Sequence, residues 1–382
     1  MPALAFATNF LWVMVIGLLG PNLPAMVTDL GISYAQAGFF FTLLSLGSLV
    51  GTSVGGIGSD FLPRKLLYGS CVLLLSLGLL VMGIAPGYIL IASCVFFLSL
   101  FGSPIGAIGQ SIMLGMFPTK REKYLSLFTL FGAMGSLLAP IFVSVNFIFS
   151  LSWRWAFVEA ACIGFLVLVA LLTVRIPPLA ANHQKVGLSE IARHRGIVVV
   201  AILIFFSTGS DFGFSYWLAE YFKTELHASL RLSSSVVGVY LIGIIAGRSL
   251  INVFLKRMSP RAITIMGLCI SLGSIIPFIV VPSIPVKVAF CFLYGFGTAP
   301  VFPLLVARGT KLFPAQPGAV TGILYGCLSL GGMVFPFLVG ILAGNFGIAA
   351  SYFFCALVVA GLLIAVLLGK APHIGPEVSA SA

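Results

Sequence analysis

The chain has 382 residues, of which 60% are hydrophobic and only 8% carry a charge. Soluble globular proteins carry about 25% charged residues, so the composition excludes an ordinary water-soluble domain and predicts an all-α membrane protein. The formal net charge of +11 does not indicate a nucleic-acid partner, because the basic residues lie mainly in short loops between apolar runs, where they set orientation in the lipid bilayer.

Twelve apolar stretches reach the length of about 20 residues that a membrane-spanning helix needs. In chain order they are 4–27, 35–58, 66–85, 88–113, 125–147, 155–174, 197–219, 233–254, 261–282, 287–309, 319–341 and 347–369. The interval 175–196 predicts a cytoplasmic linker between an N-terminal six-helix bundle (1–174) and a C-terminal six-helix bundle (197–369). The tail, 370–382, has no apolar periodicity, and we expect it to be disordered.

The distribution of Lys and Arg predicts how the chain is oriented. Fifteen of these residues fall on one side of the spans, and four fall on the other side: Arg154, Lys223, Arg231 and Lys287. The richer side, which carries both termini, is predicted to be cytoplasmic. We therefore expect a multi-pass protein of the inner (plasma) membrane. Residues 1–10 lack the basic region of a signal peptide, so the first apolar run is predicted to stay as a helix.

The second half of the chain repeats the first half at an offset of 196 residues. The matched pairs include Asp29 with Glu225, Gly47 with Gly243, Gly51 with Gly247, Pro104 with Pro300, Gly135 with Gly331 and Pro140 with Pro336. One offset that covers six spans predicts two bundles of the same topology, related by a pseudo-twofold axis along the membrane normal. Such halves place a substrate site between them near the membrane midplane.

Segment 56–65, GIGSDFLPRK, lies between the second and third spans and resembles the signature loop of the major facilitator superfamily, G-x-x-x-D-R-x-G-R-[RK]. Phe61 and Pro63 stand where that pattern has Arg and Gly. Segments 132–136 (GAMGS) and 152–157 (SWRWAF) resemble the same superfamily. The resemblance implies twelve transmembrane helices in two pseudo-symmetric bundles.

The same loop carries charges that could close the cytoplasmic side. Asp60 can pair with basic residues and with a helix N-terminus across the gate, and Arg64 and Lys65 follow it. Arg248 lies inside the eighth span, and we expect it to gate or to reach toward water, with contact to an anionic substrate as the alternative.

Three further segments are similar to the fucose–galactose–glucose:proton symporter family: GSDFGFSYWLAEY at 209–221, GIIAGR at 243–248 and APVFP at 299–303. This resemblance implies a sugar or a related metabolite that moves together with protons. The first and fourth spans lack the midspan carboxylate known in fucose permease.

Asp211 is a carboxylate near the centre of the seventh span. A midspan charge costs about 2.5–3.5 kcal/mol on insertion scales, so we expect Asp211 to carry the coupling proton, with a structural partner of Arg248 as the alternative. Glu159 is expected at the interface or as a second proton site. Asp29, Glu220 and Glu225 are expected to be solvated at the outer ends of their helices.

Uncharged polar side chains on the first, fourth, seventh, tenth and eleventh spans are candidates for substrate binding, since hydroxyls and amides suit sugar hydroxyls and aromatic faces suit a sugar ring. They are Asn22, Gln110, Ser207, Ser210, Trp217, Tyr294, Thr298 and Tyr325. Each could instead bond to a neighbouring helix.

The sequence therefore predicts a secondary active transporter of a small polar solute, working as a monomer with protons as the coupling ion. Proton-driven efflux of a drug-like or lipophilic compound is the alternative, and a non-transporting receptor or scaffold is the alternative of another class. No catalytic motif is found, so an enzyme is not expected. The seven Cys are scattered without a CxxC motif or a Cys/His cluster, and no metal or other cofactor is expected.

Overall fold

The computed structural model describes residues 2–61, 63–117, 121–174, 188–314 and 316–369. These residues contain no strand, and twelve of their helical segments are long and apolar enough to cross a membrane. The helices are α1 (Pro2–Leu30), α2 (Tyr34–Phe61), α3 (Arg64–Ile84), α4 (Tyr88–Met116), α5 (Arg121–Ile148), α6 (Arg154–Thr173), α7 (Leu188–Arg193), α8 (Arg195–Thr224), α9 (Leu230–Leu255), α10 (Pro260–Val280), α11 (Ile284–Thr298), α12 (Val301–Thr310), α13 (Pro317–Phe346) and α14 (Ile348–Leu368). The predicted all-α membrane fold is confirmed.

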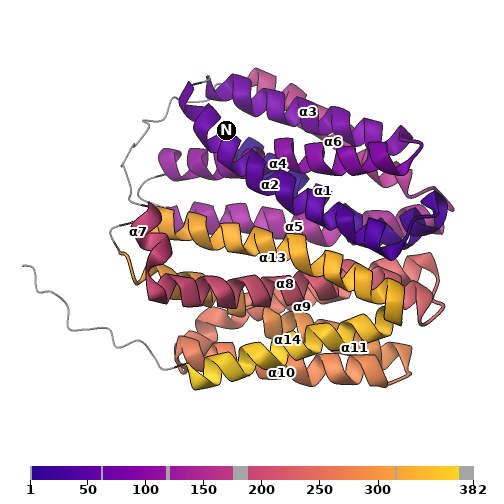
Figure 1. The fold of residues 1–382 in the computed structure, drawn as a ribbon. Helices are drawn as coiled ribbons and strands as arrows, with labels where there is room; N and C mark the ends of the chain where they lie inside the picture. The colour runs from indigo at the N-terminus through magenta and orange to yellow at the C-terminus, as the bar shows by residue number, and fades with distance from the viewer. Residues whose placement is uncertain (1, 62, 118–120, 175–187, 315, 370–382) are drawn as a thin grey trace, which may run out of the picture.

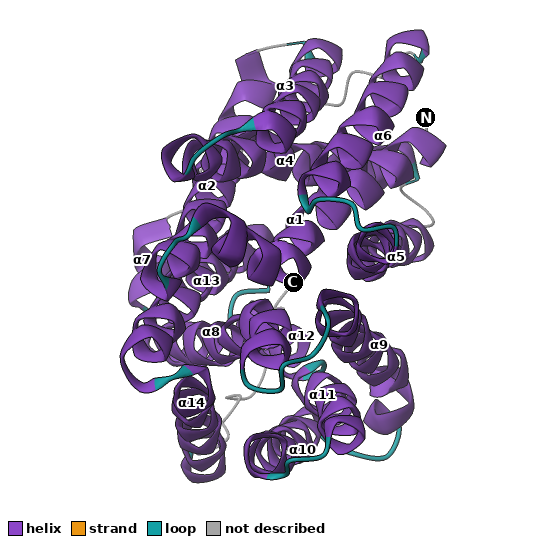
Figure 2. Cartoon of the chain, turned by 90° about the vertical axis from the view of Figure 1, so that its right-hand side faces the viewer, coloured by secondary structure: helices purple, strands orange, loops and turns teal. Residues whose placement is uncertain are grey.

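The membrane-spanning helices form two groups of matching architecture, α1–α6 and α8–α14, which lie above and below each other in Figures 1 and 2. In the first group α1 packs on α5, α2 on α4 and α3 on α6. In the second group α8 packs on α13, α9 on α11 and α10 on α14. Each pairing in one half has its counterpart in the other, so the predicted pair of pseudo-symmetric bundles is confirmed.

The repeat extends to individual backbone contacts. Gly47 of α2 lies so close to α4 that an added Cβ would overlap the carbonyl oxygen of Phe96. Gly243 of α9 lies in the same way against the carbonyl oxygen of Phe292 on α11. The two glycines and the two phenylalanines are each separated by the offset of 196 residues. Small residues let membrane helices approach closely, which explains why the repeat preserves Gly at these positions.

A basic residue caps the last helix of each half. Lys65, at the start of α3, donates from Nζ to the carbonyl oxygen of Leu172 in the last turn of α6, at 2.8 Å. Arg261, which is 196 residues further on at the start of α10, donates from Nη2 to the carbonyl oxygen of Leu367 in the last turn of α14, at 2.9 Å. A cation at a helix C-terminus satisfies unpaired carbonyls and is favoured by the helix dipole.

Two parts of the fold differ from the sequence prediction. The span predicted at 287–309 as one helix is broken between α11 and α12, at Ala299 and Pro300. Pro300 and Pro303 have no N–H to continue the helical ladder, and the paired prolines explain the break. The predicted linker contains the short helix α7, whereas residues 175–187 and the predicted disordered tail lie outside the described residues.

We predict that Gly243→Ala lowers the stability of the C-terminal half by about 1–3 kcal/mol, the usual result of overpacking. The new methyl group would overlap a backbone carbonyl that cannot rotate away. The midpoint of thermal unfolding, followed by tryptophan fluorescence in detergent, should fall by several degrees. Gly273→Ala is the matched control, because nothing lies within 4 Å of a Cβ at Gly273. Equal midpoints for the two variants would contradict this account of α9 and α11.

Candidate functional site

The two halves meet at one end of the molecule. We call the end at which α7 lies the linker end, and the opposite end, where α1 finishes at Leu30 and α2 begins at Tyr34, the distal end (Figure 1). Hydrogen bonds that cross between the halves run from Thr42 Oγ1 to Met333 O at 2.7 Å, from Ser234 Oγ to Pro21 O at 2.8 Å and between Ser144 Oγ and Ser235 Oγ at 3.0 Å. Together with the contacts around them we call this region the distal seam.

Aromatic side chains fill the distal seam between α2 and α8. Phe41 of α2 stacks on Tyr216 of α8 with ring centroids 4.3 Å apart. Trp217 is 0% exposed, meets the ring of Tyr34 edge to face and donates from Nε1 to the carbonyl oxygen of Pro336 at 2.9 Å. In this conformation the indole of Trp217, a predicted substrate contact, is therefore part of the closed seam.

One face of α13 contacts α2 in the distal seam, but toward the linker end no described atom packs on the glycines of that face. Gly322 and Gly340 are five helical turns apart and so lie on one face of α13. A Cβ at Gly340 would overlap the backbone at Tyr34 of α2, whereas no described atom lies within 4 Å of a Cβ at Gly322. Gly318 and Gly326, one turn to either side of Gly322, are equally uncovered. Over the described residues, the halves touch at the distal end and diverge toward the linker end.

Asp211 lies on α8 and is bound by groups of its own half. Tyr240 of α9 donates from its hydroxyl to Asp211 Oδ1 at 2.8 Å, and Thr298 at the end of α11 lines the same cavity as Asp211. Arg248 of α9 is exposed, and among the described residues no ion pair within 4.0 Å joins it to Asp211. The carboxyl group is half-buried at the boundary of the C-terminal half.

A cavity of about 30 Å³ adjoins Asp211 inside the C-terminal half. Its polar walls come from Ser207, Thr208, Asp211, Tyr294 and Thr298, and the break between α11 and α12 lies at its edge. A polar site of this size can hold one water molecule. The structure thus brings four of the predicted site residues together: Ser207, Asp211, Tyr294 and Thr298.

Two other predicted substrate contacts are buried and do not line this cavity. Ser210 lies inside the C-terminal half, with its hydroxyl 3.4 Å from that of Tyr294 and 3.3 Å from the carbonyl oxygen of Cys355. Asn22 is fully buried near the distal seam and donates to the carbonyl oxygen of Leu18 on its own helix. In this conformation both side chains serve helix packing.

Three polar predicted residues are exposed. Gln110 of α4 is exposed beside Gly106, which faces Trp12 of α1. Tyr325 of α13 is 50% exposed, and its ring lies 5.3 Å from that of Phe302, edge to face. Arg248 is the third. These side chains come from both halves, as a solute site between the halves requires.

The predicted cytoplasmic gate is described in part. The side chains of Asp60 and Arg64 lie outside the described residues. Lys65 is described, and its ammonium group caps α6 within the N-terminal half.

Glu220 was expected to be solvated, and that expectation is wrong. The residue is 4% exposed, and its Oε1 accepts hydrogen bonds from Thr224 at 2.7 Å and from Tyr34 at 3.1 Å. The sequence places the end of this span at 219, but α8 continues to Thr224 and carries Glu220 into the distal seam. The spacing of Phe212, Tyr216 and Glu220 at every fourth residue is the signal that could have indicated a shared face.

Lys287, which was expected at the outer end of the span 287–309, is 2% exposed. Its ammonium group donates to Tyr221 Oη at 2.8 Å and to the carbonyl oxygens of Phe278 and Ile279 in the last turn of α10. Lys287 therefore acts as a helix cap within the C-terminal half. Asp29 is partly exposed and pairs with Arg154 at 3.1 Å, the one ion pair within 4.0 Å that the described residues contain.

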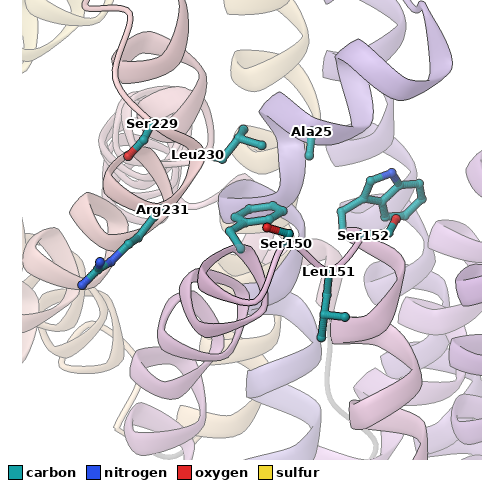
Figure 3. A pocket seen from close by; sticks show the side chains of 9 residues that line it. Ala25, Ser150, Leu151, Ser152, Ser229, Leu230 and Arg231 are labelled. Atoms are coloured by element: carbon teal, nitrogen blue, oxygen red, sulfur yellow. The ribbon is translucent and has the colours of Figure 1, made fainter.

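The distal surface carries an open depression of about 390 Å³ above the seam (Figure 3). Its wall comes from the end of α1, from the α5–α6 connection at 150–153 and from the start of α9 at Ser229 and Leu230. The side chain of Arg231 points away from the other labelled side chains. The closed seam lies between this depression and Asp211.

Comparison with known proteins assigns the fold to a family. The family model of the Major Facilitator Superfamily matches residues 5–317 and 200–381. The chain is 27% identical over 333 residues to the uncharacterized MFS-type transporter YfkL of Bacillus subtilis (strain 168), over 85% of this chain and 83% of YfkL.

Two solved structures share the fold. A D-xylose-proton symporter matches with a TM-score of 0.81 at 15% identity, over 96% of each chain. The nucleoside transporter NupG matches with a TM-score of 0.76 at 17% identity, over 97% of this chain and 98% of NupG.

Twelve spanning segments in two pseudo-symmetric bundles, closed against each other at one end, define a membrane transporter. The chain belongs to the Major Facilitator Superfamily. It is a transporter and not an enzyme.

We predict that Thr42→Val weakens the distal seam, because it removes the hydrogen bond to Met333 O. Hydrogen bonds between membrane helices contribute about 0.6 kcal/mol on average, which corresponds to roughly a threefold change in an equilibrium. Amide hydrogen exchange near Met333 should rise about threefold. Thr52→Val is the control, since Thr52 lies on the same helix and bonds only within it. Identical exchange in both variants would mean that the Thr42 contact does not hold the halves together.

Proposed function

We propose that the protein moves a small polar solute, a sugar or a related metabolite, together with protons by alternating access. The two halves rock against each other, so that a central site opens first at one membrane face and then at the other. The conformation described above, closed at the distal seam and bare at the linker end, is one of the two states that this cycle needs. Each chain carries both halves, so we infer that the monomer is the working unit.

The observation that carries the proposal is the environment of Asp211. A carboxyl group in the middle of a membrane protein is retained for function by default. Its hydrogen-bond donor Tyr240 is neutral, and Arg248 lies too far away to form an ion pair. Such a site can hold the carboxyl group either ionised, with the hydrogen bond from Tyr240, or protonated. The adjacent cavity supplies room for a water molecule that could pass the proton.

The solute site is proposed between the halves, toward the linker end. Gln110 offers an amide, Tyr325 a phenol and Arg248 a guanidinium, and these groups suit a hydroxyl-rich solute. The rings of Tyr325 and Phe302 form an aromatic wall against which a sugar ring can pack. Ser207 and Thr298 lie at the cavity beside Asp211, so a bound solute there would approach the proposed coupling group. The D-xylose-proton symporter among the structural neighbours is in keeping with this solute class.

The linker end is proposed to face the cytoplasm of a cell bounded by an inner (plasma) membrane. The excess of Lys and Arg in the connections at that end supports this orientation. With it, the conformation described is inward-facing, and the distal seam is the gate that closes the outer side.

We predict that Asp211→Asn abolishes accumulation of solute driven by a pH gradient, because the amide cannot carry the proton, while exchange of labelled for unlabelled solute continues. The measurement is uptake by proteoliposomes with and without a pH difference, using solutes that raise the thermal stability of the purified protein. Glu159→Gln is the matched control, since Glu159 is the other half-buried acid within a span and bonds to Asn146 at 3.0 Å. Continued pH-driven accumulation by the Asp211→Asn protein would exclude Asp211 as the coupling site.

We predict that a fluorescent reporter fused after residue 369 is active in the cytoplasm. A periplasmic phosphatase reporter should be active when it is fused in the connection at 149–153 instead. The reverse pattern would overturn the proposed orientation and would make the conformation described above outward-facing. The reporter activities are compared in whole cells at matched expression.

A further inference from the structure

Glu220 is a second buried carboxyl group, and it lies where the halves meet. Its Oε1 accepts a hydrogen bond from Thr224 one turn on in α8 and another from Tyr34 of α2, across the boundary, at 3.1 Å. Its Oε2 is buried and has no hydrogen-bond partner among the described residues. Tyr34 also meets the ring of Trp217, so Glu220 is enclosed by the aromatic part of the distal seam.

The charges around Glu220 do not compensate an ionised carboxylate. On α8 the charged neighbour is Lys223, which forms no ion pair with Glu220 within 4.0 Å. Glu225, just after α8, is an exposed acid. Tyr34 is the ionisable group that α2 presents, and the distal half of α13, residues 328–346, contains none. Asp29 at the end of α1 is held by Arg154 and by the indole of Trp153.

A buried charge without a partner is far more costly than a buried neutral acid. With the seam closed, one oxygen of an ionised Glu220 would lie in protein without a donor. Opening of the seam would withdraw Tyr34 on α2 and let water solvate an ionised carboxylate. The closed seam therefore favours the protonated form of Glu220, and the open seam favours the ionised form.

We propose that Glu220 is a proton-binding site that latches the distal gate: closure of the gate takes up one proton from the distal side, and opening returns it to the same side. The latch neither carries protons across the membrane nor depends on the solute or on Asp211. It makes the gate sensitive to the pH of the compartment at the distal end.

The sign and size of the effect follow from linkage. Because the closed state binds one more proton, the ratio of closed to open molecules rises as the pH falls. One proton gives at most a tenfold change in this ratio per pH unit, over the range between the titrations of the open and closed states.

The experiment is amide hydrogen exchange of the full chain in lipid nanodiscs from pH 5 to pH 8, without solute, read in segments 34–41 and 333–340 of the distal seam. At each pH the variants are compared with the wild type, so that the intrinsic pH dependence of exchange cancels. We expect the seam segments of Glu220→Gln to stay protected from exchange at all pH values. In the wild type, protection should fall by up to tenfold for each unit by which the pH rises. Glu225→Gln, an exposed acid at the same end, and Asp211→Asn should both follow the wild type.

A Glu220→Gln protein with the wild-type pH response would overturn the proposal, and so would loss of the response in Asp211→Asn. If Glu220→Gln does not fold, Tyr34→Phe replaces it: the pH response should persist while protection falls at every pH, and unchanged protection would refute the latch contact. A second readout is the infrared band of a protonated carboxyl group, which should be present at neutral pH in the wild type and reduced in Glu220→Gln. An equal band in both proteins contradicts proton binding at Glu220 in the closed state.

Discussion

Close backbone contact at glycine is the constraint on which the rest of this structure depends. Between membrane helices there is little hydrophobic gain, because lipid is as apolar as the side chains, so association relies on tight packing. Gly47 against Phe96 and Gly243 against Phe292 bring helix backbones together at matching places in the two halves. Each half is thereby a firmly packed unit, which can move as a whole against the other half.

The contact between the halves adds polar and aromatic groups to the same close backbone approach, which Gly340 makes against Tyr34 across the boundary. The distal seam consists of single hydrogen bonds from Thr, Ser and Tyr side chains together with stacked aromatic rings. Polar bonds of this type contribute about 0.6 kcal/mol each in membranes, so no single one of them holds the seam closed. Alternating access requires that all these contacts between the halves be made and broken together as the halves rock.

The sequence was sufficient to predict the parts of the structure that repeat or that follow from hydropathy. Twelve spans and two matched bundles depend on span order and on the 196-residue offset. Asp211, Tyr294 and Thr298 were each named as candidates, but their common cavity was not predicted. Hydropathy could not locate Glu220 or Lys287, because each lies at the end of a span, where an error of a few residues decides between water and protein. Hydropathy also could not predict that Trp217 is buried in the distal seam, since this burial depends on which conformation the protein adopts.

The two acids within α8, Asp211 and Glu220, differ in what the motion of the halves does to them. Asp211 and Glu220 are nine residues apart, which is about 14 Å along the helix and half a turn around it. Asp211 faces Tyr240 and Thr298 of its own half, so a rigid-body motion keeps its partners and changes only its access to water. Glu220 accepts a hydrogen bond from Tyr34 of the other half, so the same motion makes or breaks this bond.

A carboxyl group whose partners belong to its own half is suited to carry a proton between compartments. A carboxyl group whose partner belongs to the other half is suited to sense which gate is closed. On this geometry one helix carries both groups, and the half to which the partner belongs separates their tasks.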